Sequence, residues 1–236
     1  MSGLDAALRG IEGVVIGTSA GGVEALSIVL PALPANLRAC VFVVIHLPRE
    51  RSSMLVEIFS HRCALPVREA EDKEVALPGT IYFAPPDYHL LLNRGPQLAL
   101  SVDEPVHYSR PSIDVLFESA ADVYGDKLLG VILTGANADG AAGLHAVHRG
   151  GGVTVVQRPD DAHSPLMALS ALKRTTVDFV LSLDQIAGLL AALDGGSGRS
   201  PHLQQKETQT DATQGEVPAC RRPRGKSPGA LDPSAP

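Results

Sequence analysis

Residues 11–30, IEGVVIGTSAGGVEALSIVL, decide the fold. The first seven form a short apolar run that ends in Gly17, the pattern of a buried parallel strand. A helix is predicted over 19–33, because apolar residues recur at helical spacing from Val23 to Leu30. A strand that passes through a glycine-rich turn into a helix is the usual opening of a βαβ unit.

The same alternation continues along the chain, around a middle segment of different character. ACVFVVIH at 39–46 predicts the second strand, which a right-handed crossover would place parallel to the first. Between Gly79 and Val102, two β-rich runs joined at 93–95 (Asn-Arg-Gly) predict an antiparallel hairpin at one side of the sheet. Further helices are expected near Ser52–His61, at 112–125, at 139–150, near Leu166–Arg174 and at Leu183–Leu193, and further strands near Pro66–Glu69, at 127–135 and at 152–157.

These elements predict an α/β fold with a doubly wound, mostly parallel sheet, helices on both faces and an antiparallel hairpin near one edge. Hydrophobic residues make up 44% of the 236 residues, enough for a sizeable core. Trp is absent and Phe and Tyr number 5 and 4, so the core must be aliphatic rather than an aromatic binding platform. A formal charge of −6 argues against a nucleic-acid-binding protein.

The sequence predicts a soluble cytoplasmic protein without membrane insertion. The three cysteines, Cys40, Cys63 and Cys220, are scattered and odd in number, as expected of reduced thiols, and Cys40 has the place of a small core residue. The N-terminus lacks the features of a signal peptide, and no apolar run is long enough to cross a bilayer.

The composition changes at residue 194. We expect one domain over 1–193 and a disordered tail over 194–236, because the tail is too poor in branched aliphatic residues to offset its ordering entropy. The basic cluster RRPRGK at 221–226 could contact an anionic partner, although a solvated tail is the favoured interpretation.

The first candidate site is the turn GTSAG at 17–21, which fits the pattern G-x-S-x-G. Glycines on both sides of Ser19 allow a sharp turn that would project a nucleophilic hydroxyl, and the following helix would direct free N–H groups to the same point. A glycine-rich turn could instead cradle a phosphate, and Ser19 could simply cap the helix. The motif alone leaves all three interpretations open.

Two further polar residues follow strands of the predicted sheet. His46 ends the second strand, and Asp139 lies just past the strand over 127–135. Each has an ordinary alternative role, as a residue that ends a strand or caps a helix. Because the carboxyl ends of parallel strands meet at one edge, Ser19, His46 and Asp139 together predict a Ser-His-Asp triad.

From about Gly13 to Leu193, the sequence resembles the catalytic domain of the CheB family of protein-glutamate methylesterases. The resemblance is carried by GTSAGG, VVIHLP, PGTIYFAPPDYHLLL, SRPSIDVLF, GVILTGANADGAAGL and GGVTVVQ. It implies Ser19 as nucleophile, His46 as general base and then acid, and Asp139 as the orienting carboxylate. It also implies the backbone N–H groups of Ala20 and Ala136 as oxyanion donors.

The chain departs from the family pattern at several positions. Similar proteins usually carry Thr at Ala20, Met-Gly at 136–137 (Ala-Asn here) and Pro at Ala168. Residues 1–12 leave no room for the phosphorylatable receiver domain that commonly precedes this domain. We therefore expect a stand-alone catalytic domain.

Several other residues are candidates for a substrate groove or a metal site. Arg110 and His107, after the hairpin, are candidates for the rim of a substrate groove, with an ordinary surface role as the alternative, and Met167 is a third candidate. His145 and His148 have a spacing that could hold a metal, but no further ligand completes a site. We predict no metal and no cofactor.

The resemblance implies hydrolysis of glutamate γ-methyl esters on the cytoplasmic helices of methylated chemoreceptors, or on another methylated protein, in chemotaxis signalling. Glutamine deamidation would pass through the same acyl-enzyme. The alternatives are a catalytically inactive domain that binds a partner protein and, with less support, a nucleotide-binding α/β domain.

Overall fold

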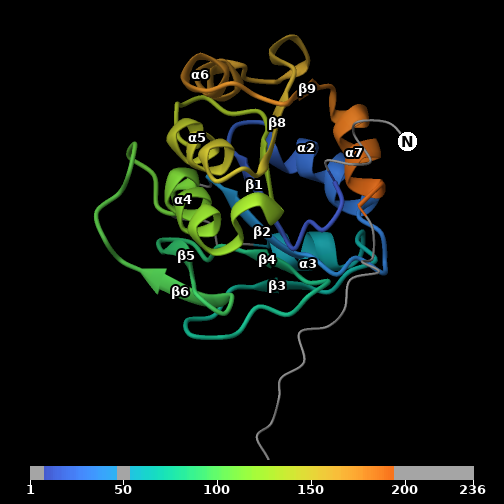
Figure 1. Ribbon diagram of the computed structural model, residues 1–236, viewed down its shortest axis with the longest axis vertical. Helices are drawn as coiled ribbons and strands as arrows, with labels where there is room; N and C mark the ends of the chain where they lie inside the picture. Colours follow the sequence, from blue (N-terminus) through green and yellow to red (C-terminus); the bar gives the residue numbers. More distant parts are fainter. Residues whose placement is uncertain (1–7, 47–53, 194–236) are drawn as a thin grey trace, which may run out of the picture. The chain divides into compact units, whose positions relative to one another are not determined.

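The computed structural model describes residues 8–46 and 54–193 (Figure 1). Its centre is a seven-stranded sheet of order β3-β4-β2-β1-β7-β8-β9, in which every neighbouring pair is parallel. The strands are β1 (Gly13–Thr18), β2 (Cys40–Ile45), β3 (Val67–Glu69), β4 (Ile81–Phe83), β7 (Leu128–Ile132), β8 (Val153–Gln157) and β9 (Phe179–Leu181). The chain adds strands on both sides of β1, with β2, β4 and β3 on one side and β7, β8 and β9 on the other, so the predicted doubly wound sheet is confirmed.

Helices cover both faces of this sheet (Figure 1). The helices are α2 (Gly22–Val29), α3 (Leu55–Ser60), α4 (Ile113–Tyr124), α5 (Ala141–Arg149), α6 (Leu166–Arg174) and α7 (Leu183–Ala191). Figure 1 shows α4 and α5 on one face and α2 and α7 on the other.

Each face of the sheet has its own buried core, and β1 contributes to both. Val14 and Ile16 belong to the core that includes the buried residues of α2 and α7. Val15, which points to the opposite face, belongs to the core that includes those of α4 and α5. All six residues of β1 are buried, which explains why the strand reads as a continuous apolar run.

The middle segment holds the main departure from the predicted arrangement. The hairpin is formed by β5 (His89–Asn93) and β6 (Gln97–Ser101), which make a separate two-stranded sheet rather than extending the main one. It is tied to α4 by a hydrogen bond of 3.1 Å from the amide of Leu92 to Ser119 Oγ. β4 lies in the 79–102 stretch that was expected to form the hairpin, but it pairs in parallel with β2 and β3 in the main sheet. The three-residue strand β9, at one edge of the main sheet, was not predicted.

Cys40 is a buried core residue, as expected, and burial raises the pKa of its thiol to about 11. Among the described residues no helix is long and apolar enough to cross a membrane. The predicted tail over 194–236, with Cys220 and the basic cluster at 221–226, lies outside the described residues, as do the first residues of the helix expected near Ser52–His61.

Candidate active site

The turn between β1 and α2 can be formed only by small residues at two positions. A Cβ atom at Gly17 would lie 2.3 Å from Cγ2 of Ile113, at the start of α4. Gly21 precedes α2 with φ of 78°, a left-handed conformation that L side chains rarely adopt. Gly17 therefore allows the end of β1 to approach α4 closely, and Gly21 allows the left-handed turn that leads from Ser19 into α2.

Backbone hydrogen bonds hold this turn between the ends of two neighbouring strands. The amide of Ser19 donates to the carbonyl of Thr134 after β7 at 2.9 Å, and the amide of His46 donates to the carbonyl of Thr18 at 3.2 Å. Because Thr18 pairs with Ile45 in the sheet, the next residues, Ser19 and His46, leave neighbouring strands at the same level. The two residues come from the β1 and β2 ends, and Asp139 follows β7 on the other side of β1.

The imidazole of His46 reaches Asp139 across the end of β1. His46 Nε2 lies 2.9 Å from Asp139 Oδ2, with 11% of the His46 side chain exposed and none of the Asp139 side chain. An ionised carboxylate can only accept hydrogen bonds, so Nε2 carries the proton and donates it. The neutral ring then keeps its lone pair on Nδ1, where a base would need it.

Asp139 is held ionised by the N-terminus of α4. Its carboxylate accepts hydrogen bonds from Ser112 Oγ at 2.8 Å and from the amides of Ile113, Asp114 and Gly140 at 2.7, 3.1 and 3.1 Å. Burial alone would raise the pKa of Asp139, but the hydrogen bonds from His46 and the α4 amides outweigh it and lower that pKa below the usual value. The expected capping role is therefore present as well, at a helix other than the one that follows Asp139 in sequence.

Two residues that sequence reasoning did not assign to the site approach the other ring nitrogen. Asn137 Nδ2 lies 3.3 Å from His46 Nδ1, and Ser109 Oγ lies 3.4 Å from the same atom. Within the described residues, no hydrogen bond joins the hydroxyl of Ser19 to His46. The only signal in the sequence was the departure from the family pattern at 136–137.

The two amides expected as oxyanion donors have no acceptor in the described part of the protein. Neither the N–H of Ala20 nor that of Ala136 donates a hydrogen bond there. Ala20 is partly exposed and Ala136 is exposed, so both can meet a bound molecule. These two N–H groups can donate hydrogen bonds to a carbonyl oxygen that develops negative charge.

The structure assigns the three groove candidates different environments. Arg110 donates through Nη1 to the carbonyls of Val102 and Asp103, at 2.8 and 3.1 Å, so its guanidinium holds the preceding loop. The side chain of His107 is half exposed and lies 3.5 Å from Asp114. The side chain of Met167 is fully buried, and its amide donates to the carbonyl of Gly135 at 3.0 Å, so Met167 supports the loop after β7.

His89 is a second support that the sequence did not reveal. Its side chain is 1% exposed, and its Nδ1 accepts the amide of Ser112 at 3.1 Å, while Nε2 lies 3.2 Å from the carbonyl of Glu104. His89 therefore fixes Ser112, which in turn donates to Asp139. A buried histidine in a hairpin strand gives no pattern that would distinguish this role from simple packing.

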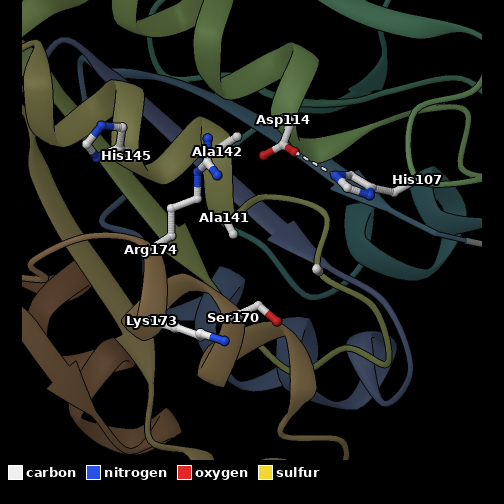
Figure 2. Close-up of a pocket in the computed structure, with 9 residues that line it drawn as sticks. His107, Asp114, Ala141, Ala142, His145, Ser170, Lys173 and Arg174 are labelled. Atoms are coloured by element: carbon white, nitrogen blue, oxygen red, sulfur yellow. Dashed lines mark ion pairs between the residues drawn. The ribbon is translucent and has the colours of Figure 1, made fainter.

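A pocket of about 590 Å³ borders the loop that carries Asp139, through Ala138. Figure 2 shows Asp114 and His107 on one side of it, with Lys173 and Arg174 from α6 on the other. His145 also lines this pocket, and its Nδ1 lies 3.2 Å from Thr175 Oγ1. Across residues 8–46 and 54–193, no three His, Cys, Asp or Glu side chains are grouped so that they could hold a metal ion.

The fold and the site define a doubly wound α/β protein in which Ser19, His46 and Asp139 follow three adjacent parallel strands at their carboxyl ends, with the imidazole hydrogen-bonded to the buried carboxylate. A family model described as CheB methylesterase matches residues 14–190. The chain belongs to the CheB methylesterase family.

Known relatives agree with this assignment. A protein of Leptospira interrogans (strain Fiocruz L1-130) named "Putative protein-glutamate methylesterase/protein-glutamine glutaminase" is 47% identical over 183 residues, which cover 78% of this chain and 95% of the relative. A protein-glutamate methylesterase/protein-glutamine glutaminase of Chromohalobacter salexigens is 38% identical over 193 residues, 80% of this chain but only 54% of that relative. The chain thus spans about half the length of this second relative.

A solved structure shares the fold. The CheB methylesterase catalytic domain of Thermotoga maritima superimposes with a TM-score of 0.74 at 33% sequence identity. The match covers 78% of this chain and 98% of the Thermotoga domain. The predicted family and fold class are therefore confirmed.

Proposed function

We propose that this chain hydrolyses the γ-methyl esters of glutamate side chains in methylated proteins, with Ser19 as the nucleophile. The observation that carries the proposal is the 2.9 Å hydrogen bond from His46 to Asp139, made at the sheet edge where Ser19 leaves the neighbouring strand. This bond leaves Nδ1 of His46 as the basic nitrogen on the side away from the carboxylate.

In the proposed reaction, Ser19 Oγ attacks the ester carbonyl carbon while its proton passes to His46 Nδ1. The amides of Ala20 and Ala136 hold the oxyanion, and Asp139 stabilises the imidazolium. The C–O bond to the methoxy group then breaks, and His46 returns the proton to that oxygen, which leaves as methanol. Water, activated by His46, cleaves the acyl-enzyme and gives glutamate.

The substrate that we propose is the methylated cytoplasmic helix of a chemoreceptor, so the reaction would take place in the cytoplasm. The names of the relatives and the family motifs support this substrate. Those names also join methylesterase with glutaminase, which supports glutamine deamidation as a second reaction, with ammonia in place of methanol as the leaving group.

The Ser19→Ala variant tests the nucleophile. We expect loss of methanol release from methylated receptor preparations and loss of labelling by a fluorophosphonate probe, because the attacking oxygen is gone. Ser60→Ala is the matched control, since Ser60 is an exposed serine at the end of α3. Undiminished methanol release by Ser19→Ala, with its fold intact by circular dichroism, would end the assignment.

A second candidate function is a domain that binds a methylated partner without turnover. The observation in its favour is that Nδ1 of His46 is approached by Asn137 and Ser109, while no described hydrogen bond reaches it from Ser19. The same probe separates the two candidates, because an unactivated Ser19 would stay unlabelled in the unmodified protein.

A further inference from the structure

We propose that Asn137, assisted by Ser109, is a positioning residue that occupies Nδ1 of His46 in the resting site and must give way before Ser19 can transfer its proton. This inference rests on the proposed function. Asn137 would thereby control when His46 can act as the base.

The orientation of the Asn137 amide follows from its hydrogen bonds. Its Oδ1 accepts the backbone N–H of Asp139 at 3.3 Å, which leaves Nδ2 to face His46 Nδ1 at 3.3 Å. The same Nδ2 lies 3.4 Å from Ser109 Oγ, so its two hydrogens can serve the imidazole and the hydroxyl together. Asn137 therefore reaches the base from the loop that also carries its orienting carboxylate.

The protonation of the ring agrees with this arrangement. Because Nε2 donates to Asp139, Nδ1 of the neutral ring has one lone pair and can accept an N–H or O–H. The amide of Asn137 and the hydroxyl of Ser109 both compete for that lone pair, as the hydroxyl of Ser19 must do during acylation. One acceptor cannot serve all three donors well, so the bond from Asn137 must break as the bond from Ser19 forms.

The contacts of Asn137 and Ser109 with Nδ1 are long, as expected of weak hydrogen bonds that break in each catalytic cycle. Distances of 3.3 and 3.4 Å exceed the usual range for strong hydrogen bonds, whereas the Asp139 contact on the other ring nitrogen is 2.9 Å. Asn137 also follows Ala136 directly in sequence. A substrate carbonyl held by the Ala136 amide would give the side-chain amide of Asn137 another acceptor nearby.

Asn137→Ala tests the proposal through the reactivity of Ser19. We expect the second-order rate of fluorophosphonate labelling to rise about twofold to tenfold, the factor that corresponds to one net hydrogen bond competing for Nδ1. Ser109→Ala should raise it by a smaller factor, since its contact is longer and it is itself held by Asn137. Asn36→Ala, an exposed asparagine in the turn before β2, is the matched control and should leave the rate unchanged.

The second measurement does not depend on activity. In protein labelled with ¹⁵N at histidine and held at pH 8, Nδ1 of His46 should resonate further downfield in Asn137→Ala than in the unmodified chain, because its lone pair loses a donor. Asn36→Ala should leave this resonance in place.

The outcomes separate this inference from the proposed function. No labelling of Ser19 in any form would defeat the proposed function, whatever the resonance shows. Labelling of the unmodified chain at a rate that Asn137→Ala leaves unchanged or lowers would overturn the inference alone, as would an unmoved Nδ1 resonance. If Asn137→Ala does not fold, Ser109→Ala carries the same two measurements.

Discussion

The fold favours the ionised form of Asp139 but the protonated form of its neighbour Asp114. The hydrogen bonds from His46 and α4 lower the pKa of Asp139, whereas burial raises the pKa of Asp114 to about 6. The negative charge of Asp139 adds to the shift of Asp114, while the amide of Gly143 and the ion pair with His107 oppose it. As the pH falls, Asp114 therefore takes up a proton before Asp139, the carboxylate that contacts the imidazole.

The raised pKa of Asp114 predicts how stability depends on pH. The usual pKa of 3.8 describes the unfolded chain, so the folded protein binds this proton more tightly. Its stabilising effect is fully present below pH 3.8 and is lost as the pH rises through about 6.

Asp114→Asn removes that loss, because an amide stays neutral and its oxygen can still accept the Gly143 amide. We expect the variant to be more stable than the parent at pH 8 by about 1–2 kcal/mol, and the difference to shrink towards pH 5. Urea unfolding at both pH values measures it. A variant that is less stable at pH 8 would mean that the contacts of the carboxylate with Gly143 and His107 outweigh the cost of burying its charge.

At the scale of elements, the end of β1, just before Ser19, packs closely against the start of α4, the helix whose first amides hold Asp139. Gly17 has no side chain because Ile113 occupies that space. The sequence pattern G-x-S-x-G, which includes Gly17, predicted a sharp turn after the strand. It could not predict the contact with α4, since Ile113 is far away in sequence and no local pattern joins them.

Gly17→Ala should therefore destabilise the protein, because the new Cβ would lie 2.3 Å from Ile113 Cγ2 and force the turn and α4 apart. We expect a loss of about 1–3 kcal/mol in the free energy of unfolding, together with slower labelling of Ser19. Gly188→Ala is the control, because the site inside α7 has nothing within 4 Å of the new Cβ. Gly188→Ala should raise the free energy of unfolding by about 0.5–1 kcal/mol.

Equal losses at both glycines would show that the approach to α4 is not what requires Gly17. A stable Gly17→Ala with unchanged labelling would contradict the close contact itself.

At the scale of the whole molecule, the central sheet joins two cores that share the strands between them. Leu26 of α2 is fully buried in one core and Leu116 of α4 in the other. We expect Leu26→Ala and Leu116→Ala each to lower the free energy of unfolding by about 2–5 kcal/mol. Both variants should still unfold in one transition, because β1 is common to the two cores.

Chemical denaturation followed by circular dichroism, with Ser19 labelling as a second probe, measures this cooperativity. Leu169→Ala in α6 is the control, since Leu169 is 49% exposed and should change stability by less than about 0.5 kcal/mol. Separate midpoints for the two probes would show that the faces of the sheet unfold independently.

The sequence was informative where chemistry and pattern coincide over many residues. The buried runs of β1 and β2, together with α6, were predicted from periodicity, and the edge where Ser19, His46 and Asp139 emerge followed from the parallel topology. The place of β4 in the main sheet, and the strand β9, were missed because pairing with β2 and β8, not a local pattern, decides both. The roles of Asn137, Ser109 and His89 were missed because they depend on contacts between segments that are far apart in the sequence.

One carboxylate joins the reactive imidazole to the architecture of the protein. The carboxylate of Asp139 accepts hydrogen bonds from the first amides of α4 and from the imidazole of His46. Because helix and imidazole share this acceptor, a substitution that shifts the first turn of α4 also shifts the base, even where neither side chain of the reacting pair is touched. Sequence changes around residues 112–114 therefore bear on catalysis as directly as changes beside Ser19.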